Sequence, residues 1–210
     1  MQSYLNIKNI QQSNSEVELH PLKPCINTET EILFLGSFPP PRKKWAKNFD
    51  FFYPNFINDH WRIMGKVYYN DKDYFVDSVN KTFFYDKVIA FIDKFKIGYF
   101  DTAQAVHRQK NNASDKFLQI ITLTDINSLI ATAKKCKLII TTGEKATTTL
   151  CEDSGILKLP AIGQLIEIPG LFNSYNTQIK LCRLPSSSRA YPLAFEKKVE
   201  IYSHVLTSML

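Results

Sequence analysis

The chain has 210 residues, of which 44% are hydrophobic and 22% are charged. This composition excludes a disordered chain, and the length fits a single domain with a sizeable core. The formal net charge of +6 permits a polyanionic partner without requiring one. No apolar run in the sequence is long enough to cross a bilayer, so we expect no membrane association.

The cysteines are far apart, and no pair has the C-x-x-C spacing of a zinc site: Cys25, Cys136, Cys151 and Cys182. The polar start MQSYLNIKNIQQSNSE does not resemble a secretory signal. We therefore expect reduced thiols and a cytoplasmic protein. The histidines show no metal-ligand spacing either, and each is interpreted as structural or surface: His20, His60, His107 and His204.

Residues 1–18 are polar and predicted to pack loosely, whereas residues 19–210 are predicted to form one domain. EILFLGS (31–37) is a continuous apolar run ended by Gly36, which predicts a buried parallel strand. NDHWRIMGKVY (58–68) predicts a helix with Asn58 as N-cap and Trp61 as a core anchor. KTFFYDKVIAFIDKF (81–95) predicts an amphipathic helix with one apolar stripe, formed by Phe84, Val88, Phe91 and Ile92.

The second half of the chain continues this alternation. IGYFDTA (97–103) predicts a strand, followed by a polar loop, VHRQKNNASD. Further strands are expected at KLIITTG, QLIEIPG and QIKLCRLPSSS, and further helices at DINSLIATAKKC, EKATTTLCEDSG and the C-terminal PLAFEKKVEIYSHVLTSML. Asp125, Gly155 and Pro192 supply the expected helix boundaries.

Strands that alternate with helices predict an α/β sandwich with a mainly parallel central sheet. In such sheets ligands bind beyond the carboxyl ends of the strands. Four segments lie at those ends, and together they form the predicted site: GSFPPP (36–41), FDTAQAVHR (100–108), TTGEKA (141–146) and LPSSSRAY (184–191).

Several common chemistries have no sequence support, because the phosphate-binding G-x-x-x-x-G-K-[ST], the dinucleotide-binding G-x-G-x-x-G and the hydrolase G-x-S-x-G motifs are absent. Asp101 follows a strand, where a carboxylate either holds a heterocyclic edge or makes an ordinary Asx turn. LPSSSRAY offers three hydroxyls and a guanidinium, either for phosphates or as a plain Ser-rich loop. PRKKWAKN (41–48) is either a nucleic-acid track or a solvated loop around Trp45.

Taken together, these segments favour one kind of site. A stiff Pro-rich turn, clustered rings, a base-edge acceptor and a phosphate-holding turn are what a pocket for an extruded nucleobase requires.

These motifs resemble those of a known family. LGSFPP resembles the first motif of the uracil-DNA glycosylase superfamily, and is closest to its hypoxanthine-DNA glycosylase branch. That branch carries G-S-F-P, then an aromatic pair and an N-x-F-W segment. Here Phe51–Phe52 and NDHW stand in those places. The strand ending in Asp101 with its basic loop and Ser-Asp, the TTGEKA turn and LPSSSRA are similar to the later motifs, in the same order, over roughly residues 20–205.

The resemblance implies a three-layer α/β/α fold and hydrolysis of the N-glycosidic bond of a deaminated base in DNA, without metal or organic cofactor. It implies that Asn58 orients water. Gly36, Ser37, Phe38 and Asp101 would bind the base, with Phe38 as a stacking wall. DNA phosphates would contact Ser186, Ser187, Ser188 and Arg189. We expect a monomer that acts without a Schiff-base lysine.

Four departures from the family pattern keep alternatives open. Phe38 stands where many members have a water-orienting Asp or Asn, and Pro40–Pro41 replace small residues. His60 replaces the usual phenylalanine, and Arg189 rather than Pro follows the third serine. A DNA or nucleotide-binding module without hydrolysis, or a nucleoside hydrolase on a similar sheet, are the competing hypotheses.

Overall fold

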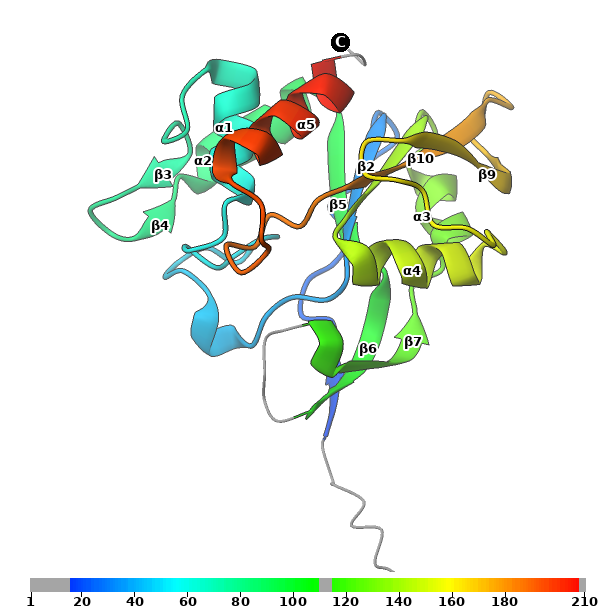
Figure 1. The fold of residues 1–210 in the computed structure, drawn as a ribbon, viewed down its shortest axis with the longest axis horizontal. Helices are drawn as coiled ribbons and strands as arrows, with labels where there is room; N and C mark the ends of the chain where they lie inside the picture. The colour runs from blue at the N-terminus through cyan, green and yellow to red at the C-terminus, as the bar shows by residue number, and fades with distance from the viewer. Residues whose placement is uncertain (1–15, 110–114, 208–210) are drawn as a thin grey trace, which may run out of the picture.

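The structure is a computed structural model that describes residues 16–109 and 115–207. Its centre is a sheet of strand order β5-β2-β8-β10-β9 (Figure 1). Four strands run parallel and the edge strand β9 pairs antiparallel with β10. The α/β class with a central sheet is confirmed. The strands are β2 (Ile32–Gly36), β5 (Ile97–Asp101), β8 (Leu138–Thr142), β9 (Leu165–Phe172) and β10 (Gln178–Leu184).

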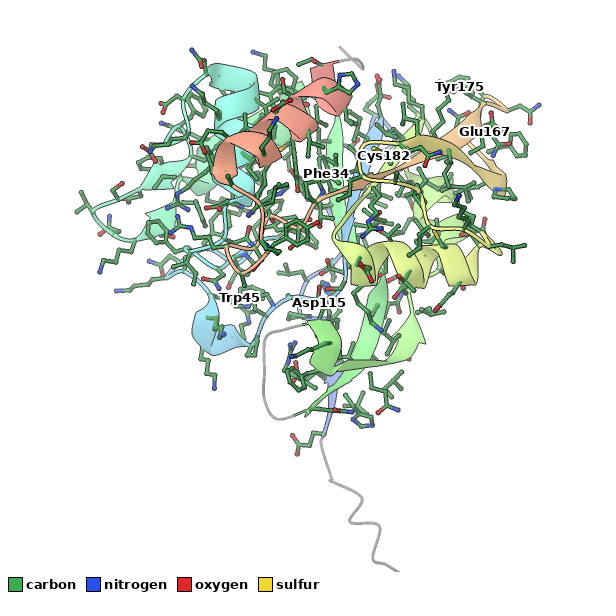
Figure 2. The ribbon with its side chains drawn as sticks, in the orientation of Figure 1. Phe34, Trp45, Asp115, Glu167, Tyr175 and Cys182 are labelled. Atoms are coloured by element: carbon green, nitrogen blue, oxygen red, sulfur yellow. The ribbon has the colours of Figure 1, made fainter. Side chains whose placement is uncertain are left out.

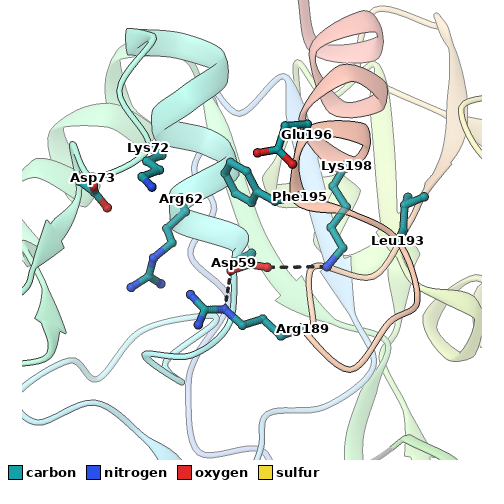
Figure 3. Close-up of a pocket in the computed structure, with 9 residues that line it drawn as sticks. All are labelled: Asp59, Arg62, Lys72, Asp73, Arg189, Leu193, Phe195, Glu196 and Lys198. Carbon is teal, nitrogen blue, oxygen red and sulfur yellow. Dashed lines mark hydrogen bonds and ion pairs between the residues drawn. The ribbon is translucent and has the colours of Figure 1, made fainter.

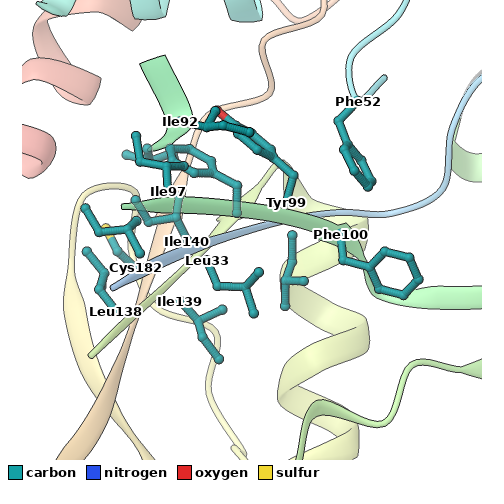
Figure 4. Packing of buried hydrophobic residues seen from close by; sticks show 14 of the residues in the cluster. Leu33, Phe52, Ile92, Ile97, Tyr99, Phe100, Leu138, Ile139, Ile140 and Cys182 are labelled. Atoms are coloured by element: carbon teal, nitrogen blue, oxygen red, sulfur yellow. The ribbon is translucent and has the colours of Figure 1, made fainter. Parts of the chain in front are cut away.

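Three of the parallel strands are buried along their whole length. Every residue of β2, β5 and β8 is buried, as expected for parallel strands covered on both faces. Their side chains pack with rings from the loop after β2 and from the helices (Figure 4). The register sets Gly36 beside Asp101 and Leu184 beside Thr142, so the carboxyl ends of these strands are level.

The helices form where the sequence predicts them: α1 (His60–Tyr69), α2 (Tyr85–Lys94), α3 (Ile126–Thr132), α4 (Glu144–Asp153) and α5 (Phe195–Thr207). Trp61 is fully buried, as predicted. Asp125 caps α3 through the backbone N–H of Ser128, also as predicted. Residue Asp59, one position after the predicted Asn58, is the N-cap of α1.

Phe84 is wrongly assigned to the buried stripe of the second predicted helix. That helix begins later, and Phe84 is its half-exposed N-cap. The preceding residues instead form β4 (Thr82–Phe83), which pairs with β3 (Val76–Asp77). Cross-strand pairing outcompetes a helical start that the 3.6-residue periodicity alone suggested.

The loop predicted after β5 is also corrected. Ala103–Arg108 forms β6, the centre of a small antiparallel sheet with β1 (Val17–Leu19) and β7 (Leu118–Leu123). Residues 1–15 and 110–114 lie outside the described residues, but β1 ties positions 17–19 to the domain. Within the two described ranges, no helix is long and apolar enough to cross a membrane.

Candidate functional site

The predicted site segments meet at one edge of the central sheet, on the side where α4 begins (Figure 1). The backbone N–H of Thr102 donates to the carbonyl of Gly36 at 2.8 Å, which joins the ends of β2 and β5. The N–H of Gly143 donates to the carbonyl of Leu184 at 2.9 Å, which joins the ends of β8 and β10. Four segments that are distant in sequence therefore form one surface.

Asp101 is held in a fixed orientation at this edge. Its Oδ2 lies 2.8 Å from Nε2 of His20, a residue from the segment after β1. The Nδ1 atom of the same ring lies 2.8 Å from the carbonyl oxygen of Leu22 and 3.1 Å from its backbone nitrogen, so both ring nitrogens have partners and the ring is fixed between Leu22 and Asp101. The other carboxylate oxygen lies over Gly36, where a Cβ would collide with it. Glycine is therefore required at position 36 by the carboxylate, and its φ is not in the left-handed region.

A second carboxylate lies beside the first. Ser37 Oγ donates a 2.7 Å hydrogen bond to Oδ1 of Asp115, the first residue of the 3-10 turn η3 (Asp115–Phe117). Asp115 lies below the carboxyl ends of the central strands (Figure 2). Burial, with a smaller contribution from the negative charge of Asp101, raises the pKa of Asp115.

An aromatic pair closes the opposite side of Gly36. The Tyr53 ring stacks on His60 with 3.7 Å between centroids, and its hydroxyl lies 2.7 Å from Thr142 Oγ1. Burial raises the pKa of Tyr53 and lowers the pKa of His60, so both rings are neutral at pH 7. His60 thus provides a flat, fully buried ring against Tyr53.

Phe38 is placed in a small second core. Its side chain is 8% exposed and packs with Ala103, Val106 and Leu118. The Phe38 and His20 rings pack in a T-shaped arrangement, with 5.3 Å between their centroids. Stacking of this ring on a base remains a prediction.

Asn58 lies just before α1 and is partly buried. Its Oδ1 accepts the backbone N–H of His60 at 2.8 Å, which makes an Asx turn at the helix start. The next residue, Asp59, donates its N–H to the carbonyl of Ser187 at 3.0 Å. Asn58 is therefore adjacent to the serine-rich loop.

That loop is compact. Ser186 Oγ accepts the N–H of Ser188 and Ser188 Oγ accepts the N–H of Ala190, each at 3.2 Å. As acceptors there, both hydroxyls keep an O–H that can be donated to a phosphate. Ser187 is only 2% exposed, so its hydroxyl is the least accessible of the three. Gly143, with φ of 90°, allows the β8–α4 turn to lie against Ser186.

Arg189 is anchored rather than loose. Its Nε donates to Asp59 Oδ1 at 2.8 Å, and Lys198 Nζ lies 3.7 Å from Asp59 Oδ2 (Figure 3). Lys198 is 1% exposed and also donates to the carbonyl of Ser188 at 2.8 Å. These groups border a charged surface pocket of about 440 Å³ between α1 and α5, which neither Ser37 nor Asp101 lines.

The basic segment after the prolines is partly organised. Trp45 Nε1 donates to the carbonyl of Pro40 at 2.7 Å, and the Arg42 guanidinium lies 3.9 Å above the indole. Lys43, Lys44 and Lys47 are exposed. Three of the four cations are thus available to a polyanion, while Arg42 stacks on Trp45 and pairs with Asp50.

Comparison with known proteins relates this chain to others by its fold. No protein-family model and no curated protein matches the sequence. Among solved structures, the chain is similar to the solution NMR structure of a "putative Uracil DNA glycosylase" from Methanosarcina acetivorans. The TM-score is 0.61 at 21% identity, over 92% of this chain and 99% of that one. The chain shares that fold. At this level of identity the likeness extends to the fold alone.

Three residues of this edge are not predicted by the sequence as site residues: His20, Tyr53 and Asp115. His20 was interpreted as structural or surface, because its contact with Asp101 spans 81 positions. The Ser-Asp pair that contains Asp115 was noticed as a motif but received no role. Tyr53 follows the aromatic pair Phe51–Phe52, and this clustering of rings was the one available signal.

Proposed function

We propose that the protein is a DNA glycosylase that hydrolyses the N-glycosidic bond of a deaminated base flipped out of DNA. The observation that carries the proposal is the Asp101 carboxylate, fixed by His20 over Gly36 at the edge where four strands end. A base turned out of the helix presents its Watson–Crick edge to such a group.

The carboxylate also suggests which bases fit. An ionised carboxylate only accepts hydrogen bonds. Uracil, hypoxanthine and xanthine carry a ring N–H on the edge where cytosine and adenine carry a lone pair. Asp101 would therefore favour uracil over cytosine and hypoxanthine over adenine, whereas guanine and thymine carry the same ring N–H and would have to be excluded by other contacts.

The remaining roles belong to the same proposal. Asn58 would orient water near the sugar, Phe38 and Ser37 would line the base pocket, and the loop would hold DNA phosphates through Ser186, Ser187, Ser188 and Arg189. The proposal includes the three-layer version of the fold, the hypoxanthine branch of the family, action as a monomer in the cytoplasm, and no cofactor.

The test is a panel of oligonucleotides, each with one uracil, hypoxanthine or xanthine, incubated with excess protein and then with alkali. Strand cleavage at one or more lesions is expected, and Asp101→Ala should abolish it while DNA binding persists. Exposed Glu167 provides a matched control, since Glu167→Ala should cleave as the wild type does. Absence of cleavage on all three lesions would contradict the proposal.

A binding module without hydrolysis is the second candidate. One observation favours it: the Asn58 carbonyl already accepts the N–H of His60, which leaves it one lone pair for water. Tight binding to the lesion strands without turnover, unchanged in Asn58→Ala, would identify this alternative.

A further inference from the structure

The edge of the sheet carries a second carboxylate that recognition of the base does not use. Asp101 is engaged through His20, and its second oxygen lies over Gly36. Asp115 is a separate carboxylate, hydrogen-bonded to the next residue of the same turn, Ser37. Two carboxylates therefore lie over consecutive residues at the end of β2.

Glycosidic hydrolysis by water leaves a proton to be removed. An amide such as that of Asn58 can align a water molecule, but it cannot accept a proton at neutral pH. Phe38, at the position where many members of the resembled superfamily have Asp or Asn, cannot do so either. The Asp101 carboxylate is expected to accept a hydrogen bond from the base. Asp115 is the carboxylate at this edge that remains for proton transfer.

We propose that Asp115 is the general base of the reaction, held in place by Ser37; this inference rests on the proposed glycosylase function. The Asp115 carboxylate removes one proton from a water molecule as the water oxygen bonds to C1′ of the deoxyribose. The bond from C1′ to the base nitrogen breaks, and its electron pair leaves with the base. The departing base then takes a proton from solvent.

The surroundings of Asp115 suit a proton acceptor. Burial and the charge of Asp101 raise its pKa, which brings a carboxylate nearer to the working pH where general bases are most effective. The hydrogen bond from Ser37 and the positive charges of Lys145 and Arg108 act in the opposite direction. Tyr53 lies within electrostatic reach and is neutral.

Ser37 would act as a positioning residue. Its 2.7 Å hydrogen bond fixes one oxygen of Asp115 and leaves the second for water. The rate should fall at low pH as Asp115 becomes protonated, and we call this fall the acid limb of the pH–rate profile. Because the hydrogen bond from Ser37 lowers the pKa of Asp115, its loss should move the acid limb to higher pH. A purely structural role for Ser37 would not shift that limb.

The experiment is single-turnover cleavage of the best lesion oligonucleotide from pH 4 to 9, with DNA affinity and melting temperature measured in parallel. Asp115→Asn should lower the rate about 100-fold or more, lose the acid limb and keep its DNA affinity. Exposed Asp153 on α4 supplies the matched control, and Asp153→Asn should leave rate and profile unchanged. Ser37→Ala should shift the acid limb to higher pH.

The outcomes separate the two proposals. If the wild type cleaves and Asp115→Asn is within threefold of it, or keeps its pH profile, the role of Asp115 is wrong and the glycosylase proposal stands. If the wild type cleaves no lesion, both are overturned. If Asp115→Asn melts well below the wild type, Ser37→Ala decides: an upward shift of the limb supports the role, and an unshifted limb overturns it.

Discussion

Asp59 Oδ1 accepts a 2.8 Å hydrogen bond from Nε of Arg189, 130 positions later in the chain. The same carboxylate lies 3.7 Å from the buried ammonium of Lys198. These contacts fasten the start of α1 to the serine-rich loop. The two segments proposed to contact sugar and phosphates are therefore held together by one carboxylate.

Removal of that carboxylate should destabilise the protein. Asp59→Ala leaves Lys198 buried without its counter-charge, and breaking a buried pair in this way costs about 3 kcal/mol of unfolding free energy. Urea denaturation measures the change. Glu29→Ala is the control, because Glu29 pairs with Lys135 on the surface, where a pair contributes less than about 1 kcal/mol. Equal losses in the two variants would show that the Asp59 contacts stabilise the fold no more than a surface ion pair does.

The sequence predicted the strands better than the site. β2 begins with the apolar run 32–35 and β8 with the apolar run 138–140, and such runs predict burial directly. The partners of Asp101 and Asp59 come from distant segments, and no local pattern reports a contact between residues 20 and 101. β6 was not predicted because its residues do not alternate cleanly: the neighbours Ala105 and Val106 are both buried, and so is the charged Arg108.

The His20 contact should affect the rate of cleavage. His20→Ala removes the hydrogen bond that orients Asp101, and a hydrogen bond to a charged group contributes roughly 1.5–3 kcal/mol. We expect the cleavage rate to fall about 10- to 100-fold. His204→Ala, on the exposed side of α5, is the control and should be silent. A rate within twofold of the wild type in His20→Ala would mean that Asp101 needs no such support.

Asp115 should make folding less favourable at neutral pH. Its pKa in the folded state is raised above the ordinary 3.8 by burial, so the folded state binds the proton more tightly than the unfolded state does. The resulting penalty is absent below pH 3.8, grows as pH rises to the folded pKa and is constant above it. Asp115→Asn should thus be more stable than the wild type at pH 7, with a gap that closes on acidification. Urea midpoints at several pH values measure this gap; a gap independent of pH would contradict the prediction.

Gly36→Ala should displace the Asp101 carboxylate, because the new methyl group would overlap its Oδ1. Overpacking of this kind costs about 1–3 kcal/mol, and cleavage should fall with it. A double-mutant cycle on the free energy of unfolding isolates the cause. In the Asp101→Ala background, Gly36→Ala should lower the free energy of unfolding much less, since the clashing atom is gone. An equal cost in both backgrounds would place the strain elsewhere.

The exposed lysines after the Pro-rich turn should contribute to DNA affinity without choosing the base. Lys43 and Lys44 are exposed, whereas the neighbouring Arg42 is stacked on Trp45. Each phosphate contact on duplex DNA adds about 0.9 to the slope of log affinity against log salt. Lys43→Ala with Lys44→Ala should thus lower that slope by up to about 2 and weaken binding to damaged and undamaged strands alike. Fluorescence anisotropy between 50 and 200 mM salt measures it. An unchanged slope would exclude these lysines from the DNA interface, and a loss confined to damaged strands would place them in base recognition instead.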